Sequence, residues 1–385
     1  MTETRAQLEG LGDKFPRAHA GDDAPAAANE SAAGQRPRSA NQFPNVQYLR
    51  ATAALIVVLW HAALETGRGA GTPLAIWHGG FGVEIFFVIS GFIITYTSRA
   101  LSGRAAAITF IHKRLARIVP LYWITTTAFI AISVLMRNLV HRSGDYDPIY
   151  IVNSYLFIPS QASDGSMQPV YGLGWSLNYE MFFYFCFAVA ILKKWMLPVV
   201  IAALVSMTML HSSLRPNSIP WALSGGFLLE FVAGVALGLL AARTTYRLPG
   251  YVFWLSTSSL LVLASIFIPH DDAYVLPTPA SFALAVAIAS VAVFSRKAFD
   301  PFGIFTILGF ASFSLYLTHM FVVRALVVAF GHRVPAEGQI AIIVAASALA
   351  AVICWKFLEA PLTARVTRWL TYKRAGGLIP RRQES

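Results

Sequence analysis

The sequence predicts an all-α integral membrane protein with about ten transmembrane helices and with both termini in the cytoplasm. Three observations lead to this fold class. Hydrophobic residues make up 56% of the 385 residues and charged residues only 13%, about half of the charged share of soluble domains. Long apolar runs recur along the chain. Most basic residues fall at alternate connections between these runs.

The apolar runs have roughly the length that crosses about 30 Å of hydrocarbon as an α-helix. The fifth run is short and is also compatible with a half-span. A further apolar stretch, 149–158, is too brief to cross, and we expect it to be interfacial or re-entrant. The expected spans are 46–64, 79–98, 115–136, 172–192, 196–211, 222–242, 251–269, 278–295, 304–330 and 338–358.

Basic residues indicate the orientation, because the cytoplasmic loops of membrane proteins carry an excess of Lys and Arg. With a cytoplasmic N-terminus, every second loop contains a basic cluster and the C-terminal tail is basic and cytoplasmic too. An odd number of spans would break this alternation. The basic residues then expected outside are only Arg68, Arg137, Arg142, Arg215 and Arg333.

The chain is expected to have three parts. Residues 1–44 are rich in Ala, Gly and charged residues and lack apolar periodicity, which is typical of a disordered segment. They also lack the apolar region of a signal peptide, so the first apolar run should stay in the membrane. Residues 45–360 should form the membrane domain, and residues 361–385 a basic cytoplasmic tail.

Composition also limits the classes of partner. The net charge of +11 does not indicate nucleic acid, because the basic residues punctuate apolar runs and form no stripe. Cys186 and Cys354 lie in apolar runs, and metal-ligand spacings such as CxxC are missing, so we expect no metal site. The expected partner is a lipid bilayer, the inner membrane of a bacterium, which the chain crosses several times.

Ionisable residues inside a span are costly and are therefore candidates for function. Arg50 and His61 in the first run are eleven residues apart, which is about 16 Å of helix rise and close to three full turns. They share a face, with Arg50 near the cytoplasmic end. This arrangement suits an elongated donor with an anionic head and a reactive far end, the shape of coenzyme A. In the structural alternative, Arg50 reaches lipid phosphates and His61 bonds a buried carbonyl.

Two acidic residues lie inside later runs. Glu84, in the second run, could orient a histidine or pair with an arginine for purely structural reasons. Glu180, in the fourth run, shares a helix face with Ser176 one turn earlier, and its position before a long apolar run favours a functional role. Trp175 opens the same run at the outer interface, where an aromatic belt residue is also expected.

Two further groups lie on single helix faces. Arg114 and Arg117 at the start of the third run could clamp phosphate, which arginine binds bidentately, or could be ordinary cytoplasmic charge. Ser312, Tyr316 and His319 form a polar stripe in the ninth run. Such a stripe must face protein or water, so it lines an acceptor cavity or ties helices together.

The sequence contains no GxSxG elbow, P-loop or HExxH motif. Their absence favours direct transfer with a histidine as general base over a serine enzyme. A histidine suits this role because its pKa lies near neutral pH.

Six segments, in order, make the chain similar to acyltransferase family 3. The similarity runs from about residue 44 to 365, and six motifs in register are far more specific than any one of them. The sequence of the second segment is most similar to that of the family branch that acetylates exopolysaccharides. The segments are NVQYLRATAALIVVLWHA, GFGVEIFFVISGFIITY, FIHKRLARIVPLYW, GWSLNYEMFFY, SFSLYLTH and FLEAPL.

The resemblance implies roles for residues that match the family motifs. Arg50 and His61 match an arginine and histidine signature whose histidine is regarded as catalytic, and Glu84 occupies an acidic position that is usually Asp. The basic pair before the third span is associated with the acyl donor. The expected site residues are therefore His61, Glu84 and Glu180 for catalysis, Arg50, Arg114 and Arg117 for the donor, and Trp175, Ser176, Tyr316 and His319 for the acceptor.

The resemblance further implies the reaction. We expect transfer of an acyl group, most simply acetyl, from acyl-CoA to a hydroxyl of a cell-surface or exported polysaccharide or its lipid-linked precursor. Acetyl-CoA is then a donor substrate, and no cofactor is bound permanently. Three alternatives remain: a glycolipid transporter or flippase that uses the buried charges for passage, an acyltransferase for a small molecule such as a macrolide, and a membrane scaffold.

Overall fold

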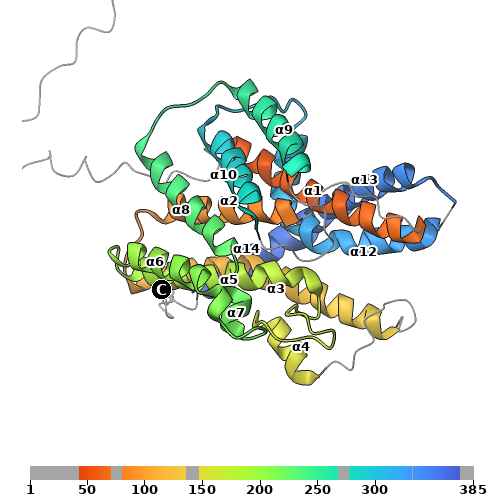
Figure 1. Ribbon diagram of the computed structural model, residues 1–385, viewed down its shortest axis with the longest axis horizontal. Coiled ribbons are helices and arrows are strands. Elements are labelled where there is room, and N and C mark those ends of the chain that lie inside the picture. Colours follow the sequence, from red (N-terminus) through yellow and green to blue (C-terminus); the bar gives the residue numbers. More distant parts are fainter. Residues whose placement is uncertain (1–42, 71–79, 136–146, 268–276, 332, 373–385) are drawn as a thin grey trace, which may run out of the picture. The chain divides into compact units, whose positions relative to one another are not determined.

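The computed structural model describes residues 43–70, 80–135, 147–267, 277–331 and 333–372, whose regular structure is helical (Figure 1). In this part of the chain the one β pairing is an isolated bridge between Leu248 and Ser295. The predicted all-α class is therefore confirmed. Nearly all of the predicted disordered segment 1–44, and residues 373–385 of the predicted basic tail, lie outside the described residues.

Within the described ranges, seven helices are long and apolar enough to cross a membrane, which identifies a multi-pass membrane protein. Two shorter apolar helices, α6 (Met196–Met209) and α10 (Pro279–Phe294), accompany them, and α8 (Phe227–Arg243) covers the sixth predicted run. The long helices are α1 (Pro44–Ala70), α2 (Gly80–Ser98), α3 (Arg104–Leu135), α5 (Trp175–Leu192), α9 (Gly250–Phe267), α12 (Ser312–Phe330) and α13 (Ala336–Cys354) with its continuation.

Three boundaries differ from the prediction. Helix α3 begins at Arg104, well before residue 115, so Arg114 and Arg117 lie within the helix and not at its first turn. The ninth predicted run, 304–330, is divided at Ala311 into α11 (Ile304–Phe310) and α12. At this break Gly309 lies against the backbone of Gln47 in α1. The expectation of one continuous helix over 304–330 was therefore wrong.

The tenth run also differs, because its helix does not end near residue 358. It continues from α13 through a π-helical segment, Trp355–Glu359, into α14 (Ala360–Tyr372). The predicted apolar run therefore ends before the helical segment does. The beginning of the predicted tail is helical and packs beside α3.

The stretch 149–158 forms a short helix, α4 (Pro148–Tyr155), that is too short to cross a membrane. Asp147 caps it by accepting a hydrogen bond from the Ile149 amide. The Tyr122 hydroxyl donates to the Ser154 carbonyl at 3.1 Å, and Trp123 Nε1 donates to the Tyr155 carbonyl at 2.9 Å. These contacts fasten α4 to α3. A further short helix, α7 (Ile219–Leu223), precedes α8.

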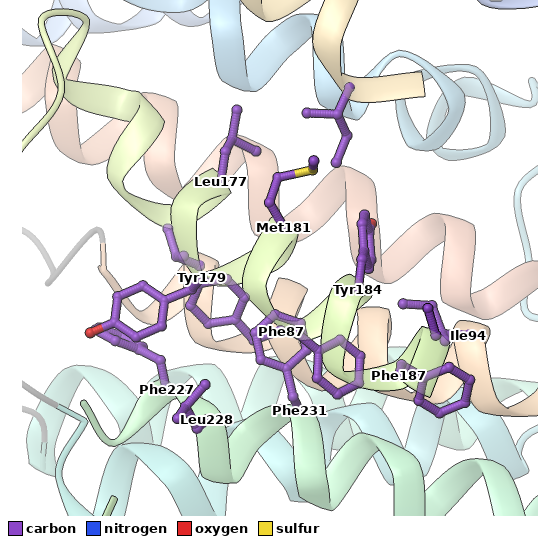
Figure 2. Close-up of a cluster of buried hydrophobic side chains, with 14 of the residues drawn as sticks. Phe87, Ile94, Leu177, Tyr179, Met181, Tyr184, Phe187, Phe227, Leu228 and Phe231 are labelled. Carbon is purple, nitrogen blue, oxygen red and sulfur yellow. The ribbon is translucent and has the colours of Figure 1, made fainter. Parts of the chain in front are cut away.

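The closest helix pair is α2 with α8. A Cβ at Gly91 would overlap the Phe231 carbonyl oxygen, and a Cβ at Gly234 would overlap the Val88 carbonyl oxygen. Small residues let membrane helices approach backbone to backbone. Figure 2 shows the aromatic cluster beside this contact, where Phe87, Phe227 and Phe231 gather with Tyr179 of α5.

We expect Gly234→Ala to destabilise the fold by about 1–3 kcal/mol, because the added methyl group forces α2 and α8 apart. The measurement is the melting temperature of the purified protein in detergent. Gly338→Ala is the matched control. A Cβ at position 338 would have a side-chain atom of Val334 as its nearest neighbour, at 3.3 Å, and would meet no backbone of another helix. Equal melting temperatures for the two variants would contradict the packing role of Gly234.

Candidate functional site

A cavity of about 760 Å³, counted with its open mouth, is lined by residues of α1, α2, α3, α5 and α12. The structure therefore joins segments that are far apart in the sequence. Six predicted site residues line the cavity, and the other four (His61, Glu84, Trp175 and His319) do not. The six lining residues are Arg50, Arg114, Arg117, Ser176, Glu180 and Tyr316.

Arg50 is buried in α1 and links it to α12. Its Nη2 donates to the Ser312 hydroxyl at 2.8 Å, and its Nη1 donates to Gln47 Oε1 at 3.3 Å. Gln47 lies one turn before Arg50 on the same helix face. A buried guanidinium must be hydrogen-bonded to be tolerated, and these two contacts aim it at the cavity.

Arg114 and Arg117 enter the cavity from α3, one turn apart. The Arg114 guanidinium lies over the rings of Phe110 and Tyr184, at 5.2 and 5.5 Å from their centroids. These aromatic faces attract the cation. Arg114 Nε is buried and has no hydrogen-bond partner among the described residues. A buried donor without a partner is costly, which points to an anionic ligand that supplies one.

Glu180 is the carboxylate that lines the cavity. Its Oε1 accepts hydrogen bonds from the Tyr184 hydroxyl and from the Ser90 hydroxyl of α2, the latter at 3.3 Å. Glu180 also interacts electrostatically with Arg50 and Arg114. The structure thus places Glu180 in the arginine cavity, and none of these contacts is with a histidine.

Three guanidinium groups and one carboxylate line the cavity, so its charge is positive when all four are ionised. This charge favours anions, and arginine binds phosphate groups bidentately. The prediction that Arg50, Arg114 and Arg117 act on one ligand requires that they meet. The fold brings them together from two helices.

The cavity lining also contains a hydroxyl pair. Ser176 Oγ lies 2.8 Å from the Tyr316 hydroxyl, and the latter donates to the Leu173 carbonyl at 2.9 Å. This contact joins the start of α5 to α12. Ser176 and Tyr316 are therefore neighbours, as their shared assignment to the acceptor requires.

His61 and His319 form a pair across α1 and α12, with His319 Nε2 at 3.2 Å from His61 Nδ1. Each Nδ1 also faces a carbonyl one turn earlier in its own helix: Val57 for His61, at 2.9 Å, and Leu315 for His319, at 3.0 Å. Carbonyl oxygens only accept, so we assign the proton of each neutral ring to Nδ1. His319 Nε2 then accepts from His61, whose own lone pair lies on Nε2.

Tyr316 connects the pair to the cavity. It lines the cavity, and its ring centroid lies 6.3 Å from that of His319. His319 is fully buried and contacts His61, Leu315 and Tyr316. The structure therefore places His319 beside His61, and its role in binding the acceptor stays a prediction.

Glu84 lies elsewhere. This buried side chain neighbours Glu230 of α8 and Ser281 of α10. Glu84 Oε2 and both carboxylate oxygens of Glu230 have no hydrogen-bond partner among the described residues. The structure therefore does not bring Glu84 to the histidine pair, and α2 carries it to a different helix interface.

Trp175 packs against the aromatic cluster beside the cavity. Its ring packs against Phe227 at 5.0 Å between centroids and edge-on to Phe87 and Tyr179. It therefore supports the wall of the cavity that carries Phe87.

Sequence reasoning missed Gln47, Ser90 and Tyr184. Tyr184 could have been found from its spacing, because it lies one turn after Glu180 on the same face of α5. Gln47 could have been found in the same way, because it lies one turn before Arg50 in α1. Ser90 gives no comparable signal, since its role depends on which helix packs opposite.

Comparisons with known proteins identify the family of the chain. The family model for an acyltransferase domain matches residues 43–359. The chain is 28% identical over 320 residues to the exopolysaccharide production protein ExoZ of Rhizobium meliloti (strain 1021), which covers 80% of this chain and 95% of the relative. It is 27% identical over 338 residues to the acyltransferase MdmB of Streptomyces mycarofaciens, covering 76% and 80%. No solved structure matches.

The cavity predicts stabilisation by a multivalent anion. Inorganic pyrophosphate at ten times its Kd should raise the melting temperature by about 1–3 °C, because ligands that bind only the folded state stabilise it. Arg117→Gln should abolish the shift. Arg333→Gln, which removes an exposed arginine that does not line the cavity, should retain it. An equal shift in both variants would show that the anion binds elsewhere.

Proposed function

The chain belongs to the acyltransferase domain family, and from this premise we propose that it transfers an acetyl group from acetyl-CoA to a polysaccharide hydroxyl. The acceptor is a cell-surface or exported polysaccharide, or its lipid-linked precursor. The observation that carries the proposal is the face of α12 that bears Ser312 and Tyr316 in the cavity lining and, one turn further on, His319 in contact with His61.

The donor is assigned to the cavity. Arg50, Arg114 and Arg117 bind the phosphates of coenzyme A. The unpartnered Nε of Arg114 donates a hydrogen bond to one of the phosphate oxygens. The apolar lining, which includes Val83, Phe86 and Ile118, suits the acyl-carrying arm. The thioester is thereby directed toward Tyr316 and the histidine pair.

His61 is the general base of this proposal. Its Nε2 takes the proton of the acceptor hydroxyl while the hydroxyl oxygen attacks the thioester carbonyl. The new C–O bond forms, the C–S bond breaks, and the departing thiolate receives the proton from His61. His319 Nε2 and the Val57 carbonyl share the proton of His61 Nδ1, and both thereby favour the tautomer that leaves the lone pair on Nε2. This is the orienting role that the sequence had assigned to Glu84 or Glu180.

The acceptor class is supported by similarity. ExoZ is named for exopolysaccharide production, and most of its length aligns with this chain. We infer that the acceptor hydroxyl approaches near Ser176 and Tyr316, whose hydroxyls can hydrogen-bond a sugar. Trp175 supports this wall without lining the cavity.

The test of the function is acetyl transfer by the purified protein in nanodiscs with radiolabelled acetyl-CoA and crude envelope glycans. Wild type should label a glycan fraction. His61→Ala should lower the rate by about 10²–10⁴-fold, the usual contribution of a general base, and His319→Ala by a smaller factor because it removes only the orienting contact. Melting temperatures check that both variants fold.

Two results would contradict the proposal. Normal labelling by folded His61→Ala protein would exclude His61 as the base. Movement of a glycolipid across the bilayer by wild type, without release of coenzyme A, would favour a transporter.

We also propose ten membrane crossings of the bacterial inner membrane, with both termini in the cytoplasm. The charge pattern supports this topology. Nine of the ten predicted runs coincide with one helix each and the ninth with α11 and α12, although not all of these helices are long enough by themselves. The test is labelling of single cysteines in a Cys186→Ala, Cys354→Ala background with an impermeant maleimide in spheroplasts.

Exposed positions on the two sides should react differently. Arg215→Cys and Arg333→Cys should be labelled from outside, whereas Lys193→Cys and Arg296→Cys should react only after lysis. All four residues are exposed, so access depends on the side of the membrane. Labelling of Lys193→Cys in intact spheroplasts would overturn the topology.

A further inference from the structure

We propose that Glu359 is a positioning residue whose carboxylate holds Arg50 and Arg117 in the arrangement that binds the anionic donor. This inference rests on the proposed function, because it identifies the counter-charge of the same arginine cluster. Glu359 lies outside the cavity lining.

The backbone turns Glu359 inward at the end of the π-helical segment Trp355–Glu359. Phe357 and Leu358, just before it, are 70% and 37% exposed, whereas Glu359 is 7% exposed. π-Helical segments are rare and frequently occur at functional sites. An acidic side chain buried in a membrane span is costly and needs compensation.

A residue of α12 offsets part of the cost of burying the Glu359 carboxylate. The Ser314 hydroxyl donates to Glu359 Oε2 at 2.5 Å. Two residues earlier on the same helix, Ser312 accepts from Arg50 at 2.8 Å. One turn of α12 therefore holds both a cation of the cavity and the anion behind it.

The remaining compensation is electrostatic. Glu359 is attracted to both Arg117 and Arg50, while Arg50 and Arg117 repel each other. Glu359 offsets this repulsion from outside the cavity. Unlike Glu180, which lines the cavity, Glu359 therefore adds negative charge without occupying space that a ligand would fill.

This geometry gives a directional expectation. If Glu359 acted only as a nearby negative charge, its removal would strengthen anion binding and lower the KM for acetyl-CoA. If it positions the arginines, its removal lets them separate, and the KM rises while the chemical step at His61 is unaffected.

The experiment measures kcat and KM for acetyl-CoA with the protein in nanodiscs. Glu359→Gln should raise the KM by about tenfold, the effect of losing one charge-assisted interaction, with kcat within about twofold. Glu359→Asp should recover part of the affinity. Ser314→Ala should give an intermediate rise, because it releases the carboxylate without changing its charge. Glu337→Gln, at an exposed position in the first turn of α13, is the matched control and should match wild type.

A KM for Glu359→Gln that equals or falls below that of wild type, at an unchanged melting temperature, would overturn the inference. If Glu359→Gln fails to fold, Ser314→Ala provides the same test with the charge intact. If wild type shows no acetyl-CoA turnover, the proposed function fails instead. The pyrophosphate-induced rise in melting temperature then tests Glu359 by itself, and an undiminished rise in Ser314→Ala and Glu359→Gln would overturn its role.

Discussion

The site depends on the cost of placing arginine side chains inside a membrane protein. A buried guanidinium is tolerated only where the protein provides hydrogen bonds, aromatic faces or counter-charges. Arg50 has Ser312 and Gln47, Arg114 has two aromatic rings, and Glu180 lies nearby with Ser90 and Tyr184. These contacts join α1, α2, α3, α5 and α12 around one cavity.

Helix α12 organises the site because one of its faces serves three purposes in succession. Ser312 holds a cavity arginine, Tyr316 bonds Ser176 at the cavity wall, and His319 bonds His61. Because of the break at Ala311, α12 begins at Ser312. This start determines which side of α12 carries Ser312, Tyr316 and His319. The break in the ninth run is thus linked to the geometry of the site.

A second acidic centre lies away from the cavity. Glu84 and Glu230 lie between α2 and α8, the pair of helices that glycines bring into backbone contact. Neither residue lines the cavity. Similar carboxyl groups in neighbouring spans therefore have different surroundings, and an acidic residue in an apolar run does not by itself mark the catalytic centre.

The sequence by itself determined the all-helical membrane class and the position of each apolar run. It also determined that residues one turn apart, such as Arg114 and Arg117, share a helix face. These features depend only on composition and on the helical period. Only the tertiary structure decided that His61 meets His319, that Glu180 joins the arginines and that Glu84 does not meet the histidines. Such contacts depend on which helices pack together and at what register, and no local periodicity specifies either. The burial of Glu359 is likewise decided by the structure alone. Its π-helical turn rotates the following residues away from the positions that the regular α-helical period predicts.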